Sequence, residues 1–281
     1  MKEDLYNDIM NTIRSFRGLS IDCERMLTEK YNSISPYTLN SILSAEVQRQ
    51  MKICHGKLFR SNKNYLTNYH KAIKRGEPVG ILIRIAKQLQ APPALLARHV
   101  LEKHYDIAKP NTPKAELKKQ FKDTTLIEDK DLAYEVYLCT LFDDQYGPIA
   151  DAIGRSVGQK YEALLQTYLT ERNIAFHDEE HLRQKGYDKT PDVKLEVPIA
   201  VNGFVINWIE SKARFGSADM HKKYIKDQFS SYWNRFGPGL VIYWFGFLDT
   251  LVQPNEKNFI IMDHFPENIT YMNPSSMKPL Q

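Results

Sequence analysis

The feature that most constrains the fold is a change in the spacing of apolar residues near residue 174. Before it, residues 2–105 repeat apolar side chains at helical intervals. After it, residues 193–199 alternate apolar and polar side chains, Asn202-Gly203 supplies a reverse turn, and residues 204–213 return as a second strand. The sequence therefore predicts an all-α N-terminal region followed by an α/β region that contains an antiparallel hairpin.

The remaining elements of the C-terminal half complete this α/β pattern. The run 240–248 is nearly all apolar, which is typical of a buried central strand. Helices and strands alternate around it, so we expect a mixed sheet flanked by helices. The expected elements are helices over residues 129–142, 148–172 and 217–236, strands over 174–177, 240–248 and 259–265, a polar loop over 178–188, and a tail beyond Pro266.

The N-terminal half is expected to form a domain of its own. Two helix pairs are separated by short breaks, near residues 32–36 and at Ala91-Pro92-Pro93, which gives the region helix-turn-helix character. Such hairpins are common in all-α folds, so they indicate DNA binding only weakly. The expected organisation is a helical, basic domain over residues 1–122, a connecting helical region over 123–147, and an α/β domain with a C-terminal tail over 148–281.

Charge is divided unevenly along the chain. Residues 1–125 contain 22 Lys and Arg against 12 Asp and Glu, and the remainder contains 16 against 22, although the net charge is only +4. No acid occurs between Val47 and Gly76, and phosphate is the natural counter-charge for such a stretch. A solvated helical face that keeps the protein soluble is the alternative. The expected nucleic-acid-binding residues are Arg49, Lys52, Lys57, Arg60, Lys63, Lys74 and Arg75, with Arg214 from the second half.

Composition and the N-terminal residues exclude several classes of protein. The longest apolar run, 239–248, is far shorter than the roughly 20 residues that span a bilayer. The first four residues include two acids, unlike a secretory signal. Three widely spaced cysteines do not make a disulfide framework, and the scattered histidines do not form a zinc pattern. We therefore expect an intracellular globular protein.

One set of charged residues falls at the same end of both hairpin strands. The first strand begins at Thr190-Pro191-Asp192, and the second ends with Glu210-Ser211-Lys212. Side chains at i and i+2 share a face of a strand, so Glu210 and Lys212 are expected to point the same way. On that side the strand also carries Phe204, Ile206 and Trp208.

The length of the hairpin turn decides whether Asp192 joins this pair. A three-residue loop, Val201-Asn202-Gly203, would set Asp192 opposite Lys212 and diagonal to Glu210. A two-residue Asn202-Gly203 turn fits the apolar alternation better, but it brings Asp192 to the site only if the chain bends after Pro191. The sequence leaves both registers open.

Two carboxylates held close together repel each other, so such a pair usually needs a cation. Their hard oxygen atoms favour Mg²⁺ or Mn²⁺, which would acidify a water and stabilise a phosphodiester under attack. Lys212 would hold the attacking water or neutralise the phosphate, and Glu162, in the helix before the sheet, is a further candidate ligand. Taken singly, each residue has an ordinary explanation: a surface helix acid for Glu162, a stabilised turn for Asp192, and an exposed ion pair for Glu210 and Lys212.

Together, Pro191-Asp192, Glu210-Ser211-Lys212 and the helix residue Glu162 resemble the motif of the PD-(D/E)XK nuclease superfamily. The resemblance covers about residues 148–265 and includes the order of the expected elements. With Thr190 and the helical N-terminal region, the chain is more closely similar to the codanin-interacting nucleases, the TPD-motif branch related to archaeal Holliday-junction resolvases.

This resemblance implies a restriction-endonuclease-like core and a metal-dependent endonuclease acting on structured or branched DNA. It assigns catalytic roles to Glu162, Asp192, Glu210 and Lys212, with the three acids as ligands of Mg²⁺ or Mn²⁺. It also implies codanin as a partner, a role in erythroid cell development, and presence in the nucleus and the cytoplasm. The helical domain departs from the resolvases, which leaves monomer and homodimer both open. A catalytically weak or inactive binding module within the codanin complex is the alternative function.

Overall fold

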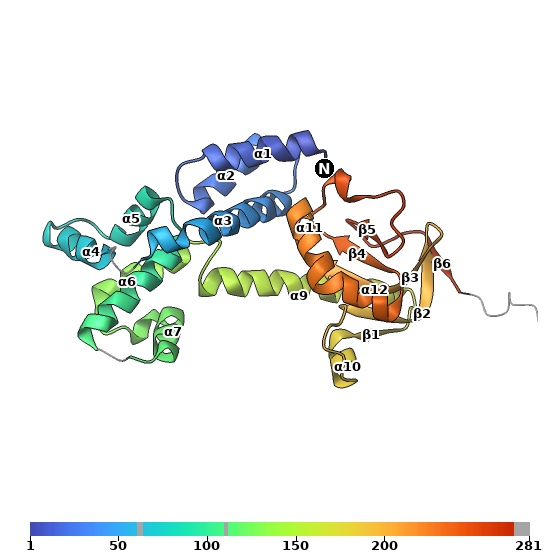
Figure 1. The fold of residues 1–281 in the computed structure, drawn as a ribbon. Helices are drawn as coiled ribbons and strands as arrows, with labels where there is room; N and C mark the ends of the chain where they lie inside the picture. Colours follow the sequence, from blue (N-terminus) through green and yellow to red (C-terminus); the bar gives the residue numbers. More distant parts are fainter. Residues whose placement is uncertain (61–63, 110–111, 273–281) are drawn as a thin grey trace, which may run out of the picture. The chain divides into compact units, whose positions relative to one another are not determined.

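The computed structural model describes residues 1–60, 64–109 and 112–272 (Figure 1). It divides into a helical unit of residues 9–155 and a sheet unit made of residues 1–8 and the described residues from Ser156 onward. This division differs from the expected one in two ways. Residues 123–155 join the helical unit, and the first eight residues join the sheet unit, where Tyr6 stacks on Phe215 with ring centroids 5.8 Å apart. No helix within the described ranges is long and apolar enough to cross a membrane.

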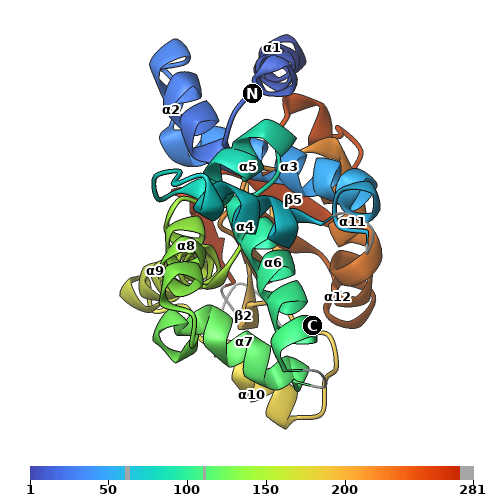
Figure 2. The same ribbon diagram turned by 90° about the vertical axis from the view of Figure 1, so that its left-hand side faces the viewer.

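The helical unit is built around α6, which packs against α4, α5, α7 and α8 (Figures 1 and 2). Pro36 and Pro93 open α3 and α6, where their fixed φ suits a first helical turn. Helix α1 begins in the sheet unit and α9 continues into it. The helices are α1 (Glu3–Ser15), α2 (Ser20–Lys30), α3 (Pro36–Leu58), α4 (Tyr65–Lys74), α5 (Ile81–Leu89), α6 (Pro93–Ala108), α7 (Lys114–Lys122), η1 (Thr124–Leu126), α8 (Lys130–Leu141) and α9 (Pro148–Glu171).

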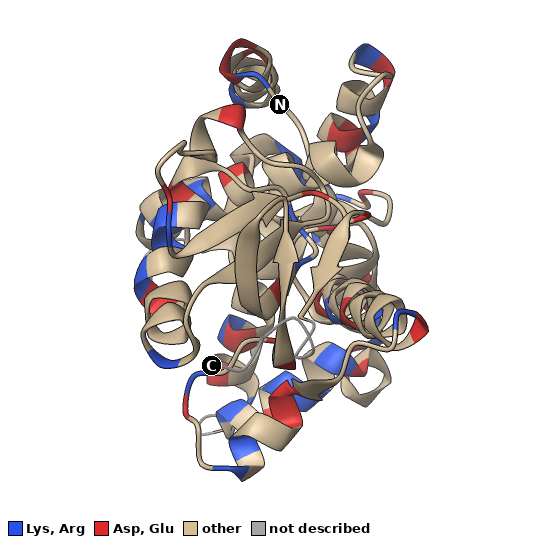
Figure 3. Cartoon of the chain, turned by 90° about the vertical axis from the view of Figure 1, so that its right-hand side faces the viewer, with Lys and Arg blue, Asp and Glu red and all other residues tan. Residues whose placement is uncertain are grey.

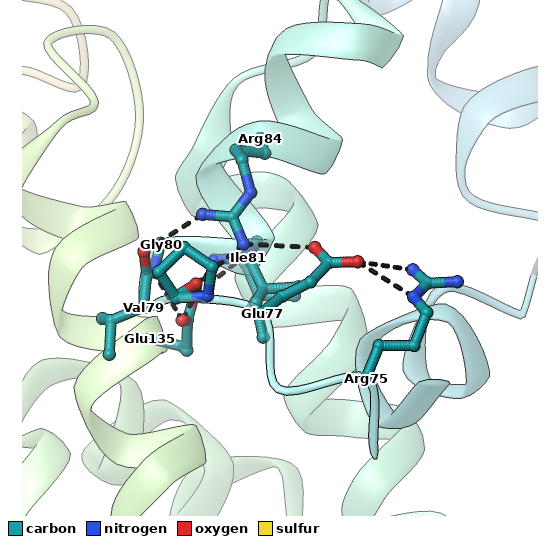
Figure 4. A network of polar contacts seen from close by, with 9 residues as sticks. Arg75, Glu77, Val79, Gly80, Ile81, Arg84 and Glu135 are labelled. Atoms are coloured by element: carbon teal, nitrogen blue, oxygen red, sulfur yellow. Dashed lines mark hydrogen bonds and ion pairs between the residues drawn. The ribbon is translucent and has the colours of Figure 1, made fainter. Parts of the chain in front are cut away.

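A buried carboxylate from α8 holds the start of α5 (Figure 4). Glu135 accepts the backbone N–H groups of Gly80 and Ile81 on Oε1, at 2.7 and 3.0 Å, and that of Leu82 on Oε2, at 2.9 Å. The first N–H groups of a helix have no partner within the helix, and its N-terminus carries a partial positive charge. The carboxylate therefore links α8 to the start of α5 and satisfies all three backbone N–H donors.

The sheet unit contains a mixed sheet in the strand order β1-β2-β3-β4-β5, with β6 paired to β2. Pairs β1–β2, β2–β3 and β2–β6 are antiparallel, and β3–β4 and β4–β5 are parallel. The elements are β1 (Phe176–Asp178), α10 (Glu179–Gln184), β2 (Val193–Val201), β3 (Phe204–Lys212), α11 (Ala218–Tyr224), the π-helix η2 (Ile225–Phe229), α12 (Ser230–Phe236), β4 (Gly239–Tyr243), η3 (Asp249–Leu251), β5 (Phe259–Met262) and β6 (Ile269–Tyr271).

Helices cover both faces of this sheet (Figure 3). Leu165 and Leu169 of α9 join one apolar cluster with the sheet, and Phe229 and Tyr232 of η2 and α12 join another on the opposite face. The second cluster is centred on Trp208, which leaves no room beside β4: a Cβ at Gly239 would lie 2.1 Å from the indole ring. The α/β layering expected for the C-terminal half is confirmed in this form.

The structure differs from the expected elements at their ends. The apolar run expected to be a strand to residue 248 leaves the sheet after Tyr243, because Gly246 adopts a φ of +81° and donates back to the Tyr243 carbonyl. The expected loop over 178–188 contains α10, which begins where the Asp178 side chain accepts the His181 N–H. The expected tail contains β6, whose three residues are ordered by pairing with β2.

Candidate active site

The hairpin β2–β3 combines a two-residue turn with a bulge. Asn202 and Gly203 both have positive φ, 50° and 81°, as a tight turn of this kind requires, and Val201 pairs with Phe204. The register then shifts between Lys194 and Ile199, so that Val193 pairs with Ile209. Continued by one position, this register sets Asp192 beside Glu210. With a two-residue turn, Asp192 reaches the site only if the chain bends. The bulge supplies this bend within β2 rather than after Pro191.

The same bulge separates the strand residues that were expected to share a face. Trp208 lies in the cluster under α12, and Glu210 and Lys212 follow it at alternate positions on that side. Phe204 and Ile206 instead join the cluster under α9. The expectation that Phe204 and Ile206 lie on the face of Glu210 and Lys212 is therefore wrong, because an irregularity in the pairing reverses the alternation partway along the hairpin.

Asp192, Glu210 and Lys212 form one hydrogen-bonded cluster. Asp192 Oδ2 accepts the Ser211 N–H at 2.7 Å, and Glu210 Oε2 accepts the Asp192 N–H at 3.3 Å. Lys212 Nζ donates to Glu210 Oε1. Glu210 is only 2% exposed, and the Lys212 side chain 14%. The ordinary explanation of an exposed surface ion pair therefore does not apply.

Burial and like charge dominate the electrostatics of this cluster. Burial and the neighbouring Glu210 raise the pKa of Asp192 well above its usual range. Burial also raises the pKa of Glu210, although Lys212 opposes this effect. For Lys212, burial lowers the pKa, but attraction to Glu210 and Asp192 outweighs it and raises the pKa overall. Two carboxylates and one ammonium leave the cluster short of positive charge, which a cation would supply.

Glu162 is placed less closely than the other three residues. It is exposed on α9, and its charge contributes to the raised pKa of Asp192. Among the residues that the structure describes, no hydrogen bond joins Glu162 to the cluster, and no three His, Cys, Asp or Glu side chains converge to hold a metal ion. The structure thus brings Asp192, Glu210 and Lys212 together and leaves Glu162 within electrostatic range.

Two neighbours of the cluster were not among the expected site residues. Buried Thr190 donates its hydroxyl to Glu179 Oε1 on α10 at 3.3 Å, and Glu179 adds to the raised pKa of Glu210. The Tyr224 ring lies 4.8 Å from Lys212 Nζ, and its hydroxyl accepts from Arg214 at 2.9 Å. The Thr190-Pro191-Asp192 tripeptide was a signal for Thr190, but no sequence pattern pointed to Glu179 or Tyr224.

Gln228 lies on the π-helix η2 that follows Tyr224. Its side-chain oxygen is buried, and no donor reaches it within the described part of the chain. π-Helical turns often accompany functional sites. Gln228 thus places one unpaired, buried acceptor in the helix layer that covers the sheet.

The expected nucleic-acid-binding residues fall into two groups. Arg49 is paired with buried Glu46 at 2.6 Å, and Arg75 with Glu77 at 2.6 Å (Figure 4). Lys52, Lys57, Arg60 and Lys74 are exposed and form no ion pair within the described ranges, Arg214 contacts Tyr224, and Lys63 lies outside the described residues. Four of the expected residues, on α3 and α4 or directly after α3, are therefore open to phosphate.

A cavity of about 190 Å³ in the helical unit is separate from these residues. It is lined by the end of α1, the start of α2, α3 and the connection from α5 to α6, including Arg14, Cys23 and Met51. None of the four expected catalytic residues lines it.

The comparisons with known proteins cover nearly all of the chain. A family model described as "Protein of unknown function TPD sequence-motif" matches residues 128–265. The chain is 43% identical over 272 residues to "CDAN1-interacting nuclease 1" of Xenopus laevis, covering 95% of this chain and 89% of the relative. It is 42% identical over 248 residues to the protein of that name from Homo sapiens, covering 87% and 88%. No solved structure matches.

Proposed function

The chain belongs to the CDAN1-interacting nuclease family, and on this premise we propose that it hydrolyses phosphodiester bonds at the cluster of Asp192, Glu210 and Lys212. The proximity of two carboxylates carries the proposal: Glu210 is 2% exposed, accepts the Asp192 backbone N–H and raises the pKa of the Asp192 side chain. Like charges buried side by side cost folding free energy, and such arrangements concentrate at functional sites. Cleavage of phosphodiester bonds at this site would explain why the fold keeps an arrangement that costs folding free energy.

We propose that the cluster works with Mg²⁺ or Mn²⁺. The donor set fits a hard divalent ion in atom type and in charge, because both carboxylates offer oxygen and together they outnumber the single ammonium group of Lys212. Asp192 and Glu210 would hold the ion, with Glu162 assisting from α9 directly or through water. When bound, the ion supplies an acidified water and neutralises charge on the phosphate.

Lys212 provides the fixed positive charge of the proposed site. Its pKa is raised by attraction to Glu210 and Asp192, which outweighs burial, so it stays protonated at neutral pH. The Tyr224 ring and Glu210 hold its ammonium group in place. From there Lys212 would orient the attacking water or neutralise the negative charge on the phosphoryl oxygens in the transition state.

We propose structured or branched DNA as the substrate and endonucleolytic cleavage as the reaction. Support comes from the resemblance of the motif to resolvase-like nucleases and from the excess of ten positive charges in residues 1–125. Phosphate contacts from Lys52, Lys57, Arg60 and Lys74 would position the DNA without reading its sequence.

We further propose that the chain binds codanin, because the relatives are named for interaction with CDAN1. A role in erythroid cell development, and presence in the nucleus and the cytoplasm, belong to the same proposal.

A catalytically weak binding subunit of a codanin complex is the second candidate. One observation favours it: Glu162 forms no hydrogen bond with the cluster among the described residues, and no three acids there converge to hold a metal ion. In that case the protein would act through its binding surfaces rather than through catalysis at the cluster.

Cleavage of a panel of single-stranded, duplex, flapped and four-way-junction DNA with Mg²⁺ or Mn²⁺ tests the proposal. We expect metal-dependent cleavage by the wild type, loss of cleavage in Asp192→Ala and in Lys212→Ala, and full activity in the control Glu267→Ala, which removes an exposed acid of the sheet unit. Absence of cleavage by folded wild-type protein that still binds codanin would favour the binding subunit instead.

A further inference from the structure

Helix α8 presents apolar side chains on both of its sides. Leu132, Val136 and Cys139 are fully buried against the core of the helical unit. On the opposite side four large side chains remain exposed: Tyr134 by 52%, Tyr137 by 44%, Leu141 by 48% and Phe142, directly after the helix, by 42%. We call these four residues the α8 face. Large apolar side chains that lie together are normally covered, so among the residues that the structure describes the α8 face lacks a partner surface.

The α8 face has the spacing of a helix that binds in a groove. Tyr134, Tyr137 and Leu141 follow one another at i, i+3 and i+7, which aligns them on one stripe. The rings of Tyr134 and Tyr137 stack, with centroids 6.4 Å apart and planes at 23°. Rigid aromatic anchors of this kind lose little conformational freedom on binding and dominate many interfaces.

The α8 face carries no charge. Between Asp131 and Asp143 the only ionisable acid or base is Glu135, apart from the tyrosines and buried Cys139, and Glu135 is buried under α5. Nucleic acid is therefore a poor match for this stripe, because phosphate needs cations. An uncharged apolar groove on another protein is the matching surface.

The size of the α8 face argues against a second copy of the chain. Half-exposed side chains of this size offer on the order of 400 Å² in total. A symmetric pair of α8 faces would bury about 800 Å², below the roughly 1,200 Å² at which stable interfaces begin. A groove that encloses the helix would also cover its flanks and reach that size.

We propose that the α8 face is the surface by which this chain binds codanin, inserted into an uncharged groove of that protein. The inference rests on the proposed function in taking codanin as the partner. One further observation supports it: the family model begins at residue 128, so it includes the whole of α8 but none of the seven earlier helices. The stretch that the family model describes thus contains an unpartnered apolar helix face in relatives named for a protein interaction.

The test measures binding of the full chain to purified codanin by isothermal titration calorimetry. We expect Tyr137→Ser combined with Leu141→Ser to weaken binding at least roughly 100-fold, since loss of one anchor commonly costs about 30-fold. The matched control combines Val79→Ser with Ile107→Ser, which removes two exposed apolar side chains of the same unit outside α8. We expect the control to bind like the wild type, and both variants to melt within a few degrees of it.

The possible outcomes distinguish an error about the α8 face as the binding surface from an error about codanin as the partner. Equal binding by the α8 variant and the wild type overturns the inference and leaves codanin binding intact. Failure of the wild type to bind overturns the proposed partner, and the inference falls with it. If the wild type self-associates in sedimentation and the α8 variant does not, the face belongs to a second copy. If the α8 variant instead loses thermal stability, the face is covered within the chain, and the inference is likewise overturned.

Discussion

Both units of the molecule bury glutamates, and Glu135 and Glu210 differ in the groups that surround them. Glu135 of the helical unit is 3% exposed and faces three backbone N–H groups of α5. Glu210 of the sheet unit is 2% exposed, accepts from Lys212 and from the Asp192 backbone N–H, and lies within electrostatic range of the Asp192 carboxylate, which carries charge of the same sign. Burial of an acid therefore does not mark a functional site. What distinguishes Glu210 is a second carboxylate nearby, that of Asp192, whose pKa it raises.

The same substitution in both glutamates gives the sharpest contrast. We expect Glu210→Gln to reduce the rate of DNA cleavage on the order of 1,000-fold, because it removes one of two ligands for the proposed ion. Its free energy of unfolding should fall less than that of Glu135→Gln, because relief of repulsion from Asp192 offsets the loss of the ion pair with Lys212. Cleavage assays and urea unfolding of one preparation measure both quantities. If Glu210→Gln lost enough unfolding free energy to explain its loss of cleavage, the distinction between Glu210 and Glu135 would not hold.

Glu135→Gln should behave in the opposite way. We expect it to lower the free energy of unfolding by about 2–3 kcal/mol, because an amide nitrogen would face a backbone donor and the negative charge at the start of α5 is lost. Cleavage per folded molecule should stay close to that of the wild type. Glu116→Ala, an exposed acid of the same unit, is the control. An undiminished unfolding free energy in Glu135→Gln would contradict the structural role.

Glu46 is a third kind of buried acid and sharpens the comparison through pH. Burial raises its pKa, but hydrogen bonds from Arg49, Arg14 and Gln50 outweigh burial and lower the pKa to about 2. Because the folded-state pKa lies below the unfolded value of 4.5, this stabilisation is complete above pH 4.5 and is lost as the pH falls toward 2.

We expect Glu46→Gln to cost about 1–2 kcal/mol at pH 7, after allowance for the half-exposed arginines. The difference from the wild type should shrink at pH 3 in urea unfolding. A difference that is constant between these pH values would show that packing, not charge, stabilises this site.

The smallest effects are expected at the exposed lysines. Each of Lys52→Ala, Lys57→Ala and Lys74→Ala should weaken DNA binding only about 2- to 3-fold and reduce the salt dependence by about one charge. Lys118→Ala on α7 is the control for loss of one exposed cation. Titrations of DNA at several salt concentrations measure the slope. An unchanged slope in all three variants would exclude this surface from the DNA path.

The sequence was sufficient for the hairpin, because an Asn-Gly turn has a backbone requirement that few other dipeptides meet. The resemblance to codanin-interacting nucleases is confirmed by relatives that cover most of the chain. The contact between Asp192 and Glu210 was not predictable from the sequence alone, because a bulge in β2 changes the register without a local signal. That bulge also moved Phe204 and Ile206 to the other face, away from Glu210.

The sequence did not predict two short elements, for a related reason. The α10 helix and the β6 strand have little pattern of their own, and they are ordered by a cap and by pairing with β2. Glu179, which contacts Thr190, lies on α10 and was missed with it. What the sequence could not show was therefore the part of the site that depends on non-local contacts.

Binding of Mn²⁺ by the wild type and by Asp192→Asn, followed by calorimetry, tests the central claim most directly. The pair of buried carboxylates predicts one ion per wild-type chain and at least a 100-fold weaker affinity in Asp192→Asn, with an unfolding free energy that is not reduced. Glu267→Gln, an exposed acid, should bind like the wild type. Equal Mn²⁺ affinity in Asp192→Asn and the wild type would contradict the assignment of this cluster as the metal site of a nuclease.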